Sequence, residues 1–88
     1  MVLHLGGGVT VPLKNIIAIM DIEKASTSRD TKEYLARAGK HKHVIAVTDD
    51  LPKSFVVSID KNLTETVYIC GVAAETLRLR MRKIYDFK

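Results

Sequence analysis

Tryptophan is absent from the sequence, and phenylalanine and tyrosine together contribute only five residues. A hydrophobic core must therefore be built mostly from aliphatic side chains, which bury less area each than aromatic ones. In a chain of 88 residues such a core gives limited stability, and there is room for only one domain. We therefore expect a single domain over residues 1–88 that is stabilised by homo-oligomerisation.

Cysteine and long apolar runs are equally scarce. Cys70 is the only cysteine, so an internal disulfide is impossible, and the first residues lack the charged flank and cleavage site of a signal peptide. The longest apolar run, residues 16–22, is interrupted by Asp21 and falls short of the roughly 20 residues that span a membrane. We expect a cytoplasmic protein without membrane contact.

Acidic residues are outnumbered, since 10 Asp and Glu face 14 Lys and Arg, for a net charge of +4. This excess is compatible with nucleic acid or another polyanion as partner. It is also common on ordinary solvated surfaces, so charge alone leaves both interpretations open. The 47% of hydrophobic and 27% of charged residues are typical of a folded globular protein.

Three consecutive glycines at positions 6–8 pose the question of a phosphate-binding loop. A dinucleotide loop needs G-x-G-x-x-G at the start of a helix, and a P-loop needs Gly-Lys followed by Ser or Thr. Here β-branched residues and Pro12 follow instead, and Val9, Val11 and Leu13 alternate with polar or proline positions. The pattern predicts a β-hairpin with a glycine turn.

The remaining segments predict alternating strands and turns, with two helices. Pro12 is expected at an edge or bulge, Lys14 and Asn15 at a corner, and residues 16–20 in a strand buried on both faces. Asp30 and Glu33 form a capping-box pattern that predicts a helix over about 29–38. Further strands are expected over 44–48, 54–59 and 66–70, with turns at 49–52 and 60–62.

The segment 73–83 is ambiguous, because Leu77 to Arg82 alternates like a strand. However, Leu77, Met81 and Ile84 also share one helical face, and the segment is rich in strong helix formers. We predict a helix. The fold class is then α+β, with a small mixed β-sheet of about five strands and two helices.

No constellation of catalytic or metal-binding residues emerges. His41 and His43 flank Lys42, which is typical of a solvated basic loop, and two imidazoles do not complete a zinc site. Cys70 lies in an apolar strand, where a thiol behaves as a small buried hydrophobe, and no base is suggested by its spacing. Asp49 and Asp50 precede Pro52 in a predicted turn, where aspartate is a typical turn residue and not one member of an acid/base pair. We therefore expect no enzyme, no cofactor and no metal.

Positive charge is concentrated near the end of the chain. On the predicted second helix Arg78 and Arg82 share a face, while Arg80 and Lys83 are rotated away, so charge surrounds much of its exposed side. In a monomer these charges create only a modest electrostatic field. In a symmetric oligomer the same residues would repeat in every copy and form a positively charged band that neutralises many phosphates.

Several segments together resemble one known family. They are LHLGGGVTVPLKNIIAIMDIE, STSRDTKEYL, PKSFVVSID and VYICGVAAETLRLR, which extend from about Leu3 to Arg80. In combination they resemble the bacterial extracellular-matrix regulators RemA and RemB, most closely the RemB branch.

The resemblance implies a compact α+β protomer that assembles into rings and binds DNA with little sequence reading; the RemA branch activates genes for biofilm matrix. Carried over by position, one basic residue of the family falls at the corner formed by Lys14 and Asn15, and another falls at Lys53. Such binding uses phosphate contacts and DNA deformability more than base edges. These residues and the basic helix form our set of candidate DNA contacts: Lys14, Asn15, Lys53, Arg78, Arg80, Arg82 and Lys83.

One departure from the family keeps two hypotheses open. The RemA branch has an arginine pair in the loop before the SFVVS strand, whereas this chain has Asp49 and Asp50, which repel phosphate. The first hypothesis is a ring-forming DNA-binding transcriptional regulator. The alternative is an oligomeric scaffold or protein-interaction module that does not bind DNA.

Overall fold

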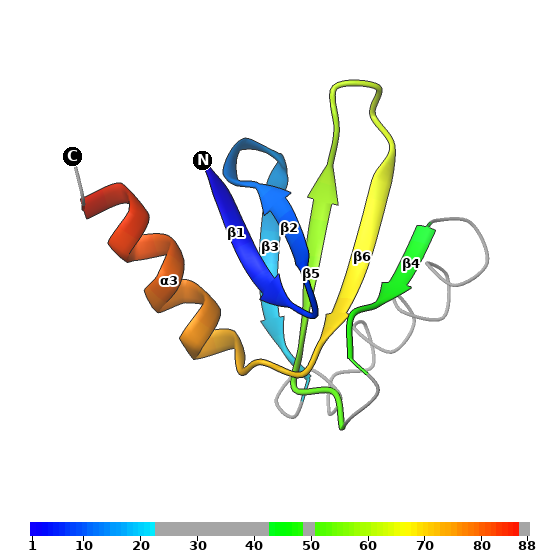
Figure 1. The fold of residues 1–88 in the computed structure, drawn as a ribbon. Helices are drawn as coiled ribbons and strands as arrows, with labels where there is room; N and C mark the ends of the chain where they lie inside the picture. Colours follow the sequence, from blue (N-terminus) through cyan, green and yellow to red (C-terminus); the bar gives the residue numbers. More distant parts are fainter. Residues whose placement is uncertain (23–42, 49–50, 87–88) are drawn as a thin grey trace.

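The structure, a computed structural model, describes residues 1–22, 43–48 and 51–86. The helix predicted over 29–38, His41, and the acidic pair Asp49 and Asp50 lie outside these ranges. The described residues form a mixed α+β fold (Figure 1). Its elements are β1 (Val2–Gly6), β2 (Val9–Pro12), the 3-10 helix η1 (Leu13–Asn15), β3 (Ile16–Asp21), β4 (His43–Ala46), β5 (Ser54–Ile59), β6 (Glu65–Cys70) and α3 (Ala74–Asp86).

The strands form two sheets. β1 and β2 pair as an antiparallel hairpin, and the other four strands have the order β3-β5-β6-β4, in which only β4 runs parallel to its neighbour. The predicted single sheet of about five strands is therefore wrong. The chain leaves the hairpin at Pro12, which cannot donate a ladder hydrogen bond, and turns through η1 before β3 starts a separate sheet.

The glycine hairpin is confirmed. Gly6, Gly7 and Gly8 all have positive φ, at 99°, 59° and 78°, which side-chain-bearing residues rarely adopt. Gly7 also approaches the chain after β4, because a Cβ there would lie 2.9 Å from the carbonyl oxygen of Val47. The glycines thus serve a sharp turn and a close backbone contact.

The main core lies between the four-stranded sheet and the elements that cover one of its faces. Leu3, Leu5 and Val11 of the hairpin and Leu77 of α3 are fully or almost fully buried there against Val56. Figure 1 shows the hairpin crossing in front of the sheet with α3 beside it. Because side chains alternate along β5, its neighbours Phe55 and Val57 point to the other face, where a second buried cluster forms with Val67.

The prediction for residues 16–20 is only partly correct. A strand forms, but it is not buried on both faces, since Ile17 is 57% and Met20 37% exposed. Among the described strands β3 has a neighbour on one side only, and Ile17 lies at a register shift between Ile16 and Ala18, where it has no paired residue on β5. The helix predicted over 73–83 is confirmed as Ala74–Asp86.

Candidate nucleic-acid interface

Lys14 and Asn15 lie in η1, the corner between the hairpin and β3, as predicted. The corner is held by a backbone hydrogen bond of 3.1 Å from the Leu13 amide to the Met1 carbonyl, and by burial of the Leu13 side chain. Lys14 is exposed, and Asn15 is half-buried. A firm backbone therefore presents the Lys14 ammonium to solvent.

Lys53 is presented from an equally firm position before β5. Its amide donates to the Cys70 carbonyl at 2.8 Å, and its own carbonyl accepts from the Ile22 amide at 3.0 Å. The backbone of Lys53 thus joins the ends of β3 and β6, while its side chain is exposed. Such anchoring reduces the backbone entropy lost when the residue binds a ligand.

The two lysines lie at opposite ends of the four-stranded sheet. β3 begins directly after η1 with Ile16 paired to Ser58, and it ends with Asp21 paired to Ser54, next to Lys53. A strand of six residues spans roughly 20 Å. One protomer therefore does not bring Lys14 and Lys53 together into a single basic patch.

The arginines of α3 have separate environments. At about 100° per residue, Ala74, Leu77, Met81 and Ile84 form a stripe that faces the core. Arg78 and Arg80 then flank this stripe at about 80° on either side, whereas Arg82 and Lys83 point further outward. The flanking positions bring guanidinium groups close to the strands that the helix covers.

Both flanking arginines bind backbone carbonyls. Arg78 Nη2 donates to the carbonyl of Ile19 in β3 at 2.8 Å, and Arg80 Nη1 donates to that of His4 in β1 at 3.1 Å. Each side chain therefore joins α3 to a different sheet. A guanidinium has five N–H groups, so donors are left in both cases. The sequence contained no signal for these contacts, because they depend on which strands lie beside the helix.

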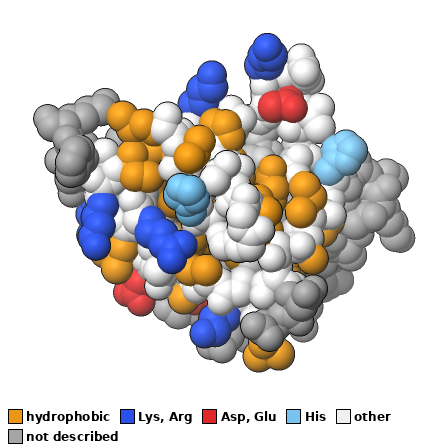
Figure 2. All heavy atoms as spheres, viewed as in Figure 1, with side chains coloured by type: hydrophobic (Ala, Val, Ile, Leu, Met, Phe, Trp, Pro, Cys, Tyr) orange, Lys and Arg blue, Asp and Glu red, His pale blue; other side chains and the backbone are white. Residues whose placement is uncertain are grey.

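Arg82 and Lys83 are exposed, and neither has a hydrogen bond or ion pair among the described residues. Among the four candidate DNA contacts on α3, Arg82 and Lys83 therefore present their charge to solvent, whereas Arg78 and Arg80 are engaged with backbone carbonyls. Figure 2 shows Lys and Arg side chains at separate places on one face, with apolar and uncharged surface between them. On this face the described Lys and Arg side chains do not merge into one continuous basic patch.

Cys70 is fully buried, as the apolar strand predicted. Burial raises the pKa of its thiol to about 11, and a hydrogen bond with Ser54 opposes this shift. A thiol with so high a pKa carries little nucleophilic thiolate near neutral pH. Within the described ranges there is no group of three or more metal-ligating side chains, and no helix is long and apolar enough to cross a membrane.

A family profile described as RemA-like, extracellular matrix regulatory protein A-like, matches residues 2–81. The match covers both sheets and the first two turns of α3. The chain belongs to the RemA-like family. No curated protein matches the sequence significantly. The family match includes Lys14, Lys53, Arg78 and Arg80, while Arg82 and Lys83 follow it.

Proposed function

We propose that this RemA-like chain is a cytoplasmic transcriptional regulator of extracellular-matrix genes that forms an oligomeric ring and binds DNA mainly through phosphate contacts. The family match over residues 2–81 carries the proposal, because it associates the chain with a matrix regulator. The exposed cations Lys14, Lys53, Arg82 and Lys83 supply the charge for phosphate contacts. The proposal assigns no catalysis and no cofactor to the chain.

The separation of these cations explains why the proposal includes an oligomer. Each phosphate contact by Lys or Arg releases counterions, and affinity increases with the number of contacts. Lys14 and Lys53 lie at opposite ends of a strand of roughly 20 Å, so one protomer makes few contacts along one stretch of duplex. A ring repeats the same cations around its circumference and so multiplies the contacts.

A second candidate is an oligomeric scaffold without DNA binding. Leu51 and Leu63 are 81% and 79% exposed, and burial of such apolar side chains stabilises contact with a protein but not with a polyanion. In addition, Asp49 and Asp50 precede Leu51 in the sequence, close to the proposed contact Lys53. Their negative charge opposes phosphate binding at this place.

Fluorescence anisotropy of a long labelled duplex, titrated with the full chain at several salt concentrations, tests the proposal, with light scattering on the same samples. We expect binding by an oligomer whose affinity falls steeply with salt. An oligomer that fails to bind DNA at low salt would favour the scaffold instead. A charge-reversed double variant, Arg82→Glu with Lys83→Glu, then tests the helix; these residues suit the test because neither is hydrogen-bonded to the described part of the fold.

A further inference from the structure

The hairpin presents one of its faces to solvent. Side chains alternate along β1 and β2, so one set is buried in the core and the other set points outward. The outward set, which we call the hairpin face, consists of Val2, His4, Thr10 and Pro12. Residues 1–15 contain no Asp or Glu, so neither the hairpin nor η1 contributes an acidic side chain. The hairpin face therefore has no negative charge of its own.

His4 and Thr10 lie side by side on this face. They are register partners across the hairpin, as are Val2 and Pro12. Pro12 has no amide proton, so it cannot form a hydrogen-bonded pair with Val2. Hydrogen-bonded and non-hydrogen-bonded pairs alternate along an antiparallel ladder, so the pair of His4 and Thr10, two positions further, is also non-hydrogen-bonded. In such a pair the Cα atoms are about 4.5 Å apart, which brings the two side chains close together.

The same pairing directs the His4 carbonyl toward α3, because the backbone groups of a non-hydrogen-bonded pair point away from the partner strand. This carbonyl accepts from Nη1 of Arg80 at 3.1 Å, and Figure 1 shows α3 beside β1. The bond uses one N–H group of a guanidinium that has five, and the Arg80 side chain is exposed. The Arg80 guanidinium, the His4 imidazole and the Thr10 hydroxyl thus gather at one edge of the hairpin face. We call these three groups the donor cluster.

The donor cluster suits a phosphate. Glu75, the acid in the first turn of α3, lies about 140° around the helix from Arg80, so it is not a neighbour of the guanidinium. Figure 2, viewed from the same side as Figure 1, shows histidine next to a Lys or Arg side chain on this face. The phosphate oxygens of DNA accept hydrogen bonds, and Arg and Thr side chains are among their usual donors. The cluster therefore offers several donors and a positive charge to one backbone phosphate.

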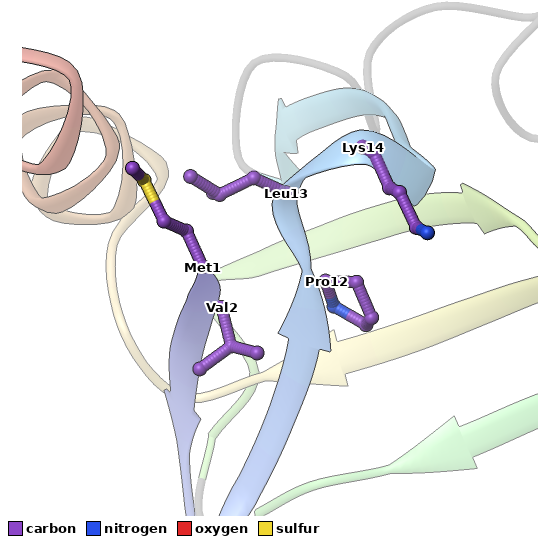
Figure 3. Close-up of a pocket in the computed structure, with 5 residues that line it drawn as sticks. All are labelled: Met1, Val2, Pro12, Leu13 and Lys14. Carbon is purple, nitrogen blue, oxygen red and sulfur yellow. The ribbon is translucent and has the colours of Figure 1, made fainter.

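A second cation stands at the open end of the hairpin. A hollow at this end is lined by Met1, Val2, Pro12, Leu13 and Lys14. Figure 3 shows Val2 and Pro12 side by side between β1 and β2, with Lys14 to one side of them. The chain advances at most about 14 Å between Thr10 and Lys14, and about four base pairs of DNA have the same rise. The donor cluster and Lys14 are therefore within reach of one stretch of duplex.

We propose that the hairpin face is the DNA-binding surface of the protomer, where the donor cluster binds one backbone phosphate and Lys14 binds another. The inference rests on the DNA binding in the proposed function and assigns a surface to it. His4 and Thr10 were not among the contacts predicted from the sequence, because only the strand register and the packing of α3 bring them together with an arginine. Val2 and Pro12, between the two phosphate contacts, have no side-chain donor or acceptor with which to read base edges.

The test measures the anisotropy of a long labelled duplex, titrated with the full chain at several salt concentrations. Thr10→Val removes the hydroxyl and keeps a β-branched side chain, and His4→Phe removes the imidazole donors and keeps a ring. We expect each variant to weaken binding at least about threefold at every salt concentration, as for the loss of a hydrogen bond to a charged group. The salt dependence should stay unchanged, because neither variant removes a cation. Lys14→Ala should instead make the slope of log affinity against log salt shallower by roughly one unit.

Matched controls remove the same groups elsewhere. Thr64 and His43 are exposed like Thr10 and His4, but they lie in the turn between β5 and β6 and at the start of β4. Thr64→Val and His43→Phe should therefore change the affinity by less than about twofold. Circular dichroism checks the fold of every variant, and light scattering checks that it keeps the oligomer mass of the wild type.

Three results would overturn the inference. If the wild type binds DNA and Thr10→Val and His4→Phe bind as tightly, or if the controls weaken binding equally, the surface is wrong while DNA binding stands. A loss of affinity that accompanies a loss of oligomer mass would place the hairpin face between copies of the chain and not on DNA. A wild type that fails to bind DNA at low salt overturns both this surface and the DNA binding in the proposed function.

Discussion

At the scale of single residues, the three glycines of the hairpin turn are not equivalent. A Cβ at Gly7 would lie 2.9 Å from the carbonyl oxygen of Val47, which is backbone and cannot rotate away. A Cβ at Gly8 would have no heavy atom of another residue, apart from its chain neighbours, within 4 Å. Both positions have positive φ, so an alanine at either is strained, but only at Gly7 does a steric clash add to the strain.

We expect Gly8→Ala to lower the free energy of unfolding by about 1 kcal/mol, the cost of a left-handed backbone. Gly7→Ala should lower it by at least about 2 kcal/mol, because the end of β4 must also move. Urea titration followed by circular dichroism measures both. Equal effects at the two positions would show that the contact with Val47 contributes nothing to stability.

Cys70 makes a prediction for alkaline pH. Burial raises the pKa of its thiol from 9.0 to about 11 in the folded chain, so above pH 9 the unfolded chain loses this proton first. The folded state then binds more protons than the unfolded state, and the free energy of unfolding decreases as pH rises from about 9 to 11. The slope is at most about 1.4 kcal/mol per pH unit.

Lysine and tyrosine also titrate in this range, so the measurement compares the wild type with Cys70→Ala. We expect the loss of stability between pH 8 and 10.5 to be smaller in the variant. Parallel pH profiles for the two proteins would mean that the thiol has the same pKa in both states. Below pH 8 the thiol is neutral in both states and contributes no pH dependence.

At the scale of elements, α3 is attached by more than its apolar stripe. Arg78 donates a hydrogen bond to the Ile19 carbonyl on β3, which has one neighbour among the described strands. The guanidinium therefore occupies an edge carbonyl that is otherwise available for pairing with another chain. Arg80 makes the corresponding bond to β1.

We expect Arg78→Ala to lower the free energy of unfolding by about 1.5 kcal/mol, a typical value for a hydrogen bond from a charged group. Arg82→Ala is the matched control and should change it by less than about 0.5 kcal/mol, because Arg82 is exposed and has no partner among the described residues. Chemical denaturation of both variants provides the comparison. A loss of stability as large for Arg82→Ala would contradict a structural role specific to Arg78.

At the scale of the whole molecule, the positions of the cations determine how DNA binding should respond to substitution. Lys53→Ala should weaken binding about equally on all DNA sequences and make the dependence of log affinity on log salt shallower by roughly one unit, as for the loss of one phosphate contact. Lys53→Arg keeps the charge and should keep the slope. Anisotropy titrations on two unrelated duplexes measure both effects, and a loss confined to one duplex would argue for base contacts.

The sequence by itself determined the features that depend on neighbouring residues. The glycine hairpin, the corner at Lys14 and Asn15, the burial of Cys70 and the helix at the end of the chain follow from turn chemistry, alternation and helical spacing. Family membership also followed from the sequence, because it is carried by many positions along residues 2–81. None of these requires knowledge of which strands pair.

Only the tertiary structure decided the features that depend on strand order. β3 is an edge strand of the described sheet, and Ile17 falls at the register shift between Ile16 and Ala18, where it is exposed although its local pattern predicted burial. The same order places Lys14 and Lys53 at opposite ends of the sheet, and the packing of α3 engages Arg78 and Arg80 with backbone carbonyls while it leaves Arg82 and Lys83 in solvent. The physical reason is that hydrophobic periodicity determines which face of an element is buried, whereas the neighbours of that element depend on how the whole chain packs.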